Sequence, residues 1–163
     1  MAVQTSYSNT HSPAYEGMKA STSEVFDTQS YFAEGGNILA GRGVVFGTDP
    51  DKQCELPAVS STDALIAGVS MYEVNRVQTS ANASENQDRP ITIVKKGVLW
   101  AAAIDGAAPG DPVYLVINAA GGVLGTFRST ATATAGHSVL VSGAKWLSTA
   151  TAGNLAKLSI NRA

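Results

Sequence analysis

The chain has 163 residues, of which 44% are apolar and only 15% are charged, and its formal net charge is −2. This length can hold one domain with a substantial core but not two, and the weak negative charge excludes a strongly basic nucleic-acid binder. A single cysteine, Cys54, excludes an internal disulfide and a thiolate metal cluster, so we interpret it as a small packing residue.

The first residues carry no signal for secretion or membrane insertion. The segment MAVQTSYSNTHSPAYEG has neither a basic n-region nor an apolar h-region. No apolar run approaches the roughly 18 residues that span a bilayer. We therefore expect a protein that is made in a cytoplasm and stays there, unless it leaves as part of something larger.

Residues 1–36 differ from the rest of the chain and are predicted to form an extended N-terminal arm. They are rich in Ser, Thr and Gln and show no sustained hydrophobic period. Aromatic residues scattered in such a polar segment cannot bury one another in a compact core. We expect them to dock on another subunit, with packing on the chain's own barrel and disorder as the alternatives. The candidate contact residues are Tyr7, Tyr15, Phe26, Tyr31 and Phe32.

From residue 37 to 163 the sequence alternates strand-like segments with turns, which predicts an all-β domain, a small antiparallel barrel or sandwich. No capped segment of 3.6-residue period is long enough for a crossover helix, so parallel α/β folds are set aside. Lys95, Lys96 and Gly97 are expected to divide one run into two strands. The strand-like runs are 37–46, 65–77, 90–104, 113–117, 139–147 and 155–160. The residues expected to be buried are Val44, Phe46, Ile66, Val69, Ile93, Leu99, Val113, Leu115, Val139 and Leu158.

The composition of two segments predicts where strands are interrupted by a turn or a loop. In AAPGDPVYLV, Pro109 and Pro112 fix φ and remove two backbone donors, so a turn must precede the strand at 113–117. The segment 130–136, TATATAG, is of low complexity and is predicted to be an exposed loop.

Motifs that could carry chemistry each lack a required residue. The segment 136–140 begins like a nucleophile elbow, but no acid or histidine follows Ser138. The segment from Asp49 resembles a calcium loop, yet its sixth and twelfth positions are Cys54 and Ser60. The sequence therefore predicts no catalytic, cofactor-binding or metal-binding residue, no cofactor, and a protein that is not an enzyme.

Charge is spread unevenly along the chain. Residues 112–163 carry four bases and no carboxylate, whereas residues 1–111 carry seven bases and thirteen acids. Such polarity would orient the protein on an oppositely charged partner. The alternative is chance variation in a charge-poor sequence.

A succession of short segments over residues 38–163 resembles the structural cement, or decoration, proteins on the heads of tailed bacteriophages. The segments are 41–46 (GRGVVF), 66–70 (IAGVS), 96–100 (KGVLW), 109–114 (PGDPVY), 121–123 (GGV), 144–148 (AKWLS) and 153–158 (GNLAKL). Each is a common β-turn sequence, and it is their order and spacing that carry the resemblance.

The resemblance implies a β-barrel-like domain that oligomerises, as a dimer or trimer, on the outer capsid surface and clamps neighbouring major capsid proteins. It implies assembly in the host bacterial cytoplasm and no direct contact with nucleic acid or membrane. The arm aromatics then become candidate capsid contacts. The alternatives are another virion module, such as a tail or fibre component, and a small β-fold hydrolase.

Overall fold

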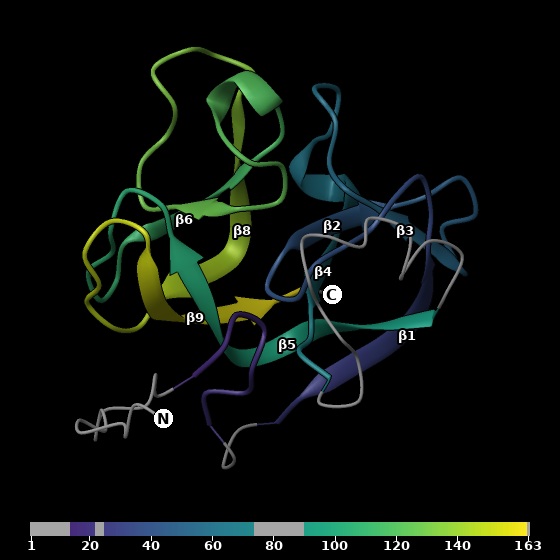
Figure 1. Ribbon diagram of the computed structural model, residues 1–163, viewed down its shortest axis with the longest axis horizontal. Helices are drawn as coiled ribbons and strands as arrows, with labels where there is room; N and C mark the ends of the chain where they lie inside the picture. The colour runs from purple at the N-terminus through teal and green to yellow at the C-terminus, as the bar shows by residue number, and fades with distance from the viewer. Residues whose placement is uncertain (1–13, 22–24, 74–89, 163) are drawn as a thin grey trace, which may run out of the picture.

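The computed structural model of the chain describes residues 14–21, 25–73 and 90–162. These residues form strands and two short 3-10 helices, without an α-helix among them, so the predicted all-β class is confirmed (Figure 1). The elements are β1 (Asp27–Ala33), β2 (Gly43–Phe46), β3 (Gln53–Glu55), η1 (Asp63–Leu65), β4 (Ile66–Ser70), β5 (Pro90–Ala103), β6 (Pro112–Val116), η2 (Ala119–Gly121), β7 (Phe127–Arg128), β8 (Ser138–Trp146) and β9 (Asn154–Asn161).

The sheet closes into two small rings that share β5. The strand order is β1-β3-β2-β4-β5-β7-β6-β8-β9, and the additional pairings β1–β5 and β5–β9 close the two rings. We name the ring of β1, β3, β2, β4 and the first half of β5 the N-terminal barrel, and the other ring the C-terminal barrel. In Figure 1, β5 runs from the first ring on the right to the second on the left.

Strand β5 is a continuous strand of 14 residues, and the predicted division at Lys95–Gly97 is wrong. What changes there is the pairing partner, because Lys96 lies opposite both Asp27 of β1 and Asn161 of β9. Gly97 has φ +144°, and a Cβ at this position would lie 2.8 Å from the ring of Phe26. The glycine therefore admits an aromatic ring against the strand rather than making a turn.

The buried apolar residues form two clusters: one lies in the N-terminal barrel, and a larger one fills the C-terminal barrel and extends onto β2 and β4 through Val45, Ile66 and Val69. The N-terminal core includes Tyr31, Val44, Cys54 and Ile93, and the C-terminal core includes Trp146. Other members of the C-terminal core are Leu99, Val113, Leu115, Phe127 and Leu158. Of the ten residues predicted to be buried, eight are 0–3% exposed, while Phe46 and Val139 are partly buried.

The first strand lies inside the segment that was predicted to be an arm. β1 pairs with β3 and β5, and its residues Tyr31 and Ala33 are 2% and 0% exposed. The sheet therefore begins before the predicted boundary at residue 36. Only Tyr31 and Ala33 of β1 are buried, so the strand has too little alternation to be recognised in the sequence.

Other strand boundaries also differ from the predictions. The short strands β3 and β7 were not predicted, β2 begins only at Gly43, and β4 ends at Ser70. Residues 74–77 of the predicted run 65–77 lie outside the described residues.

The predicted turn before residue 113 and the predicted exposed loop at 130–136 are both confirmed. Asp111 accepts a hydrogen bond from the N–H of Ala108 at 2.8 Å, Gly110 has φ +93°, and β6 begins at Pro112. Residues 130–136 form a loop in which all residues but one are exposed.

Candidate functional site

Residues 14–21, which we name the N-terminal strap, lie along β5 beside the N-terminal end of β1. The N–H of Gly17 donates to Trp100 O at 2.7 Å, and the N–H of Trp100 donates to Met18 O at 2.8 Å. Ala20 continues the pairing by donating to Val98 O at 2.9 Å. The strap and β1 therefore run antiparallel to β5 along both barrels, and they tie the barrels together through backbone hydrogen bonds.

A close contact between two glycines holds the strap in place. Gly17 has φ +77°, and a Cβ there would lie 2.6–2.8 Å from backbone atoms of Gly41, Ser70 and Tyr72. Only glycine fits this approach without a shift of the backbone. The neighbouring Glu16 carboxylate lies 3.6 Å from the guanidinium of Arg42.

The structure places the five candidate aromatic residues in different environments. Tyr15 is 61% exposed and stacks on Tyr72 with ring centroids 5.3 Å apart, and Phe32 is 49% exposed. Phe26 packs against the C-terminal core, beneath the ammonium of Lys19 at 4.6 Å.

Of the two remaining candidates, one is buried and the other lies outside the described residues. Tyr31 is buried in the N-terminal core, because β1 turns this side chain inward, and it meets Phe46 edge-on with ring centroids 6.1 Å apart. Tyr7 lies outside the described residues.

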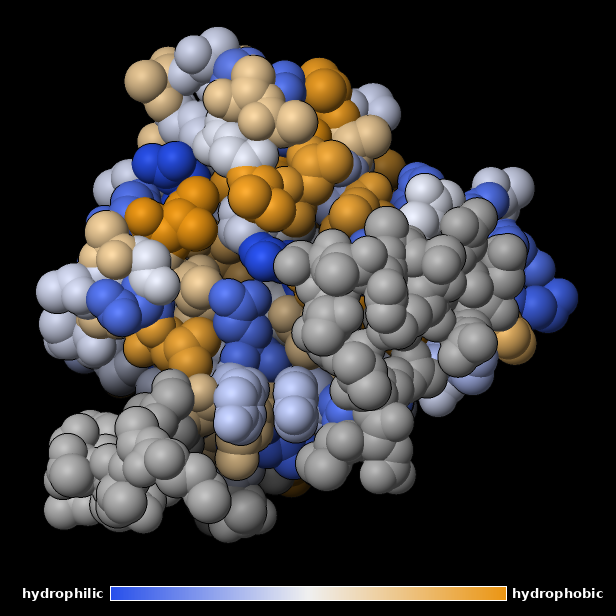
Figure 2. All heavy atoms as spheres, in the orientation of Figure 1, coloured by the Kyte–Doolittle hydropathy of each residue, from blue (hydrophilic) through white to orange (hydrophobic). Residues whose placement is uncertain are grey.

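Exposed apolar side chains on both barrels were missed by the sequence analysis. They stand in apolar runs or in loops, where the pattern does not tell which side of a strand faces solvent. Figure 2 shows apolar side chains gathered in the upper part of one face, over the C-terminal barrel and the space between the barrels. Exposed apolar residues outside the N-terminal segment are Val59, Leu65, Val123, Leu140 and Leu147.

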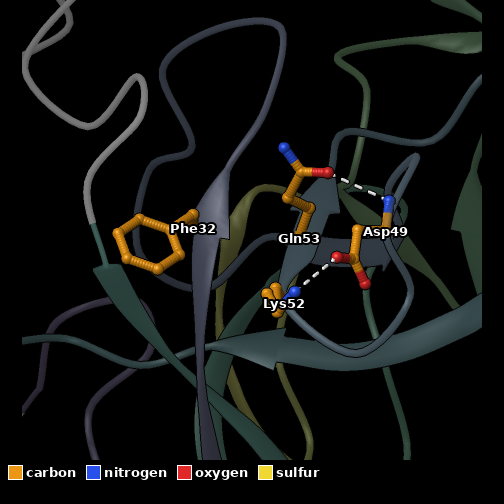
Figure 3. Close-up of a pocket in the computed structure, with 4 residues that line it drawn as sticks. All are labelled: Phe32, Asp49, Lys52 and Gln53. Atoms are coloured by element: carbon orange, nitrogen blue, oxygen red, sulfur yellow. Dashed lines mark hydrogen bonds and ion pairs between the residues drawn. The ribbon is translucent and has the colours of Figure 1, made fainter.

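A hollow of about 320 Å³ lies beside the exposed ring of Phe32 (Figure 3). Its other lining residues, Asp49, Lys52 and Gln53, come from the turn before β3 and from its first residue. Lys52 donates to the Asp49 carboxylate at 3.1 Å, and this hydrogen bond lowers the pKa of Asp49. The hollow is therefore lined by an aromatic ring, that of Phe32, and by the ion pair of Lys52 and Asp49.

The carboxylate of Glu34 lies near the same turn. It accepts hydrogen bonds from the N–H and the hydroxyl of Thr48 at 2.7 and 2.8 Å. These bonds lower the pKa of Glu34, so the carboxylate stays ionised at neutral pH. The turn is therefore held to the end of β1 by a charged group.

A second hollow, of about 360 Å³, lies where β5 changes partners. It is bounded by the exposed side chain of Val25 and by residues of β5 and β9. The lining residues are Val25, Lys96, Gly97, Ser159, Ile160 and Asn161. This hollow borders the Phe26 packing site described above and contains no pair of groups suited to acid–base chemistry among its lining residues.

The uneven charge of the sequence is partly compensated in the fold. Arg162 donates to the Asp63 carboxylate at 2.7 Å, and Arg128 lies 3.5 Å from the Asp105 carboxylate. Two of the four bases of residues 112–163 are therefore paired with acids from the first 111 residues. Lys157 lies over the ring of Trp100, 5.5 Å from its centroid.

Hydrogen bonds and a nearby arginine lower the pKa of both acids. Burial alone would raise the pKa of Asp63, but hydrogen bonds from Ser142 and the charge of Arg162 hold it below its ordinary value. Burial is likewise outweighed at Asp105, whose pKa is lowered by hydrogen bonds from Thr130 and Ser129.

Burial raises the pKa of the Cys54 thiol to about 12, so it is a neutral packing group at physiological pH. Among the described residues, no three His, Cys, Asp or Glu side chains are grouped to hold a metal ion. Within the same ranges, no helix is long and apolar enough to cross a membrane.

The fold is thus a module of two linked β-barrels with apolar side chains exposed on both. Over residues 3–161 the chain matches the family described as structural cement protein (E217 gp24/Pam3 gp6), and it belongs to this phage family. Its role is therefore that of a capsid cement, or decoration, protein, and the resemblance found in the sequence is confirmed.

The fold is also found in a solved structure. A chain of "The capsid of Myoviridae Phage XM1" superposes with a TM-score of 0.73 at 19% sequence identity, covering 99% of this chain and 98% of that one. No curated protein sequence matches the chain. At this identity the structural likeness shows the shared fold, whereas the family match carries the role.

Proposed function

We propose that this protein binds the outer surface of the phage head, contacts the major capsid protein and holds neighbouring capsid subunits together. The observation that carries the proposal is the family match, which extends over nearly the whole chain, from residue 3 to residue 161, and so includes the N-terminal segment.

The arrangement of the barrels supports a clamping role. A load applied to one barrel is transmitted to the other through the backbone hydrogen bonds of β5 and the strap, rather than through a flexible linker. Exposed apolar residues lie on both sides of this connection, for example Phe32 on the N-terminal barrel and Leu140 on the C-terminal barrel. Two separated contact areas on a rigid body suit a protein that bridges two subunits.

Among the aromatic residues proposed as capsid contacts, we retain Tyr15, Phe32 and Tyr7. The first two support the proposal by their exposure, because large aromatic side chains contribute strongly to interfaces when a partner covers them. Phe26 and Tyr31 instead support the surface from beneath by packing in the cores.

We also propose that the protein self-associates on the capsid as a dimer or trimer, assembles in the host bacterial cytoplasm and acts without catalysis or direct binding of nucleic acid or membrane. The raised pKa of Cys54, the single thiol, agrees with a non-catalytic role.

The test is to mix the full-length protein with expanded, undecorated phage heads and with isolated tails. We expect electron microscopy to show regular density on the outside of the heads and heads that break open at a higher temperature. Binding to tails alone would favour the tail or fibre alternative. Heads that remain bare at saturating protein would overturn the proposal.

A further inference from the structure

The first half of β1 is exposed on both faces and is paired along one edge. Residues 27–30 are all exposed, and this half pairs with β5. Strand β3 reaches only the other end of β1, where it pairs with Phe32 and Ala33. Between Thr28 and Ser30 the strand carries no proline or lysine, the residues that commonly protect a strand edge.

The hydrogen bonds of β1 show which backbone groups face the other edge. The N–H of Phe32 donates to Lys52 O at 2.8 Å, so the backbone polar groups of Phe32 point away from β5. Because this direction alternates along an antiparallel strand, those of Thr28 and Ser30 point the same way. No described residue hydrogen-bonds to them on this side. Two N–H and two C=O groups therefore form an open strand edge.

The open edge leads directly to the hollow beside Phe32. The ring of Phe32 lies on the same face of β1 as the side chains of Thr28 and Ser30, because side chains at alternate positions share a face. A strand added along the edge would thus place a side chain near this hollow of about 320 Å³. A strand edge next to a pocket is the arrangement by which proteins bind extended peptides.

The charge around the edge indicates the occupant. Glu34, Asp49 and Asp51 surround the turn that borders the hollow, and Lys52 is the only base of residues 47–53, which gives the four side chains a balance of −2. A second copy pairing through its own β1 would bring no base to this turn, because Asp27 is the one charged residue of that strand. A basic segment of another protein would instead be attracted.

We propose that β1 binds an extended, basic segment of the major capsid protein as an added strand, with an apolar side chain of that segment in the hollow beside Phe32. The inference rests on the proposed function and names the surface and the kind of segment that it uses. Main-chain hydrogen bonds to Thr28 and Ser30 supply the affinity. The hollow selects an apolar side chain, and the acidic turn selects basic residues beside it.

The first test replaces Ser30 by proline in the full-length protein and measures the affinity for undecorated heads. The N–H of Ser30 has no partner among the described residues, so Ser30→Pro should leave the far-UV circular dichroism and the melting temperature close to those of the wild type. It removes one donor and places a ring on the edge, so we expect binding to weaken about tenfold or more. Ser30→Thr, which keeps the N–H, is the matched control and should bind normally.

The second test examines the hollow and the charge. Phe32→Ser and Asp51→Lys should each weaken binding to heads, and raising the salt concentration should weaken binding of the wild type more than that of Asp51→Lys. If Phe32→Ser binds heads normally, the hollow is not part of the binding site. If Asp51→Lys binds heads normally, the bound segment is not selected for basic residues.

The outcomes separate this inference from the proposed function. If the wild type and Ser30→Pro bind heads equally well, the open edge is not the capsid site, although the cement function stands. If the wild type does not bind heads, both proposals fail. If Ser30→Pro changes the sedimentation of the free protein, the occupant is a second copy and the assignment to the capsid protein is wrong.

Discussion

The two barrels differ in how they are closed and in how much they bury. The C-terminal barrel is closed by the β5–β9 ladder of eight residue pairs and encloses Trp146 and Phe127. The N-terminal barrel is closed by the shorter β1–β5 ladder of six residue pairs, and its core is the smaller of the two clusters. We therefore expect the C-terminal barrel to contribute most of the stability, whereas the N-terminal barrel leaves one edge of β1 unpaired at Thr28 and Ser30 among the described residues.

The largest expected effect is in the C-terminal core. Trp146 is 0% exposed, so Trp146→Ala should lower the free energy of unfolding by about 3–5 kcal/mol through lost burial and a cavity. Urea unfolding followed by circular dichroism measures this change. A loss no larger than that caused by Ile93→Ala in the N-terminal core would contradict the difference between the barrels.

The link between the barrels can be loosened at Gly17. Gly17→Ala should cost about 1–3 kcal/mol and expose the strap to protease, because its Cβ would meet backbone atoms at 2.6–2.8 Å. Gly153→Ala is the matched control: its φ of +79° is similar, but no atom lies within 4 Å of the added Cβ. If both variants lose the same stability and keep the strap protected, the close contact does not hold the strap.

Cys54 reports on the opening of the N-terminal barrel. The thiol is fully buried with its pKa raised to about 12, so alkylation at pH 8 should be slow and should accelerate at urea concentrations below those that unfold the C-terminal core. Cys54→Ser should cost about 1–3 kcal/mol for burial of a hydroxyl, yet leave capsid binding within a few-fold. Alkylation that begins only with global unfolding would show that the barrels open together.

Lowering the pH should remove a smaller contribution to stability, which comes from the ionised carboxylates of Asp63 and Asp105. The folded-state pKa values of Asp63 and Asp105 lie below the ordinary 3.8, so their stabilisation is present above 3.8 and is lost as the pH falls through the lowered values. The melting temperature of Asp63→Asn should therefore fall less between pH 5 and about pH 3 than that of the wild type. Parallel curves for the two proteins would exclude Asp63 as a source of the acid sensitivity.

The smallest effect is expected at the joint before β6. Pro112→Ala should lower the stability by about 0.4–1 kcal/mol, because proline restricts the unfolded chain at a position that already fits its φ. Binding to heads should be unchanged. Weak binding at unchanged melting temperature would instead make this turn a contact surface.

The sequence was sufficient for the features that depend on local chemistry. The prolines around Gly110 and the β-branched residues that follow them predicted a turn and then a strand, and β6 begins at Pro112 as expected. The ordered short segments from residue 38 onward also identified the cement family, because they preserve the spacing of strands and turns.

The pairing of strands that are distant in sequence decided which side chains are buried and which are exposed. Tyr31 and Phe32 are adjacent aromatic residues, yet the former is buried and the latter is 49% exposed, because β1 pairs with β3 and β5 in a register that turns Tyr31 inward. Gly97 follows two lysines and looks like a turn, but it lies inside β5, where its missing Cβ makes room for Phe26.

The sequence by itself determined the fold class, the position of the main turns and the family, since backbone preferences and apolar patterns act over a few residues. The tertiary structure alone decided that two rings share β5, that Arg162 pairs with Asp63 from 99 residues away, and that no described residue pairs with the outer edge of β1 at Thr28 and Ser30. These features depend on which distant strands meet and in what register, and the local pattern of side chains does not specify that choice.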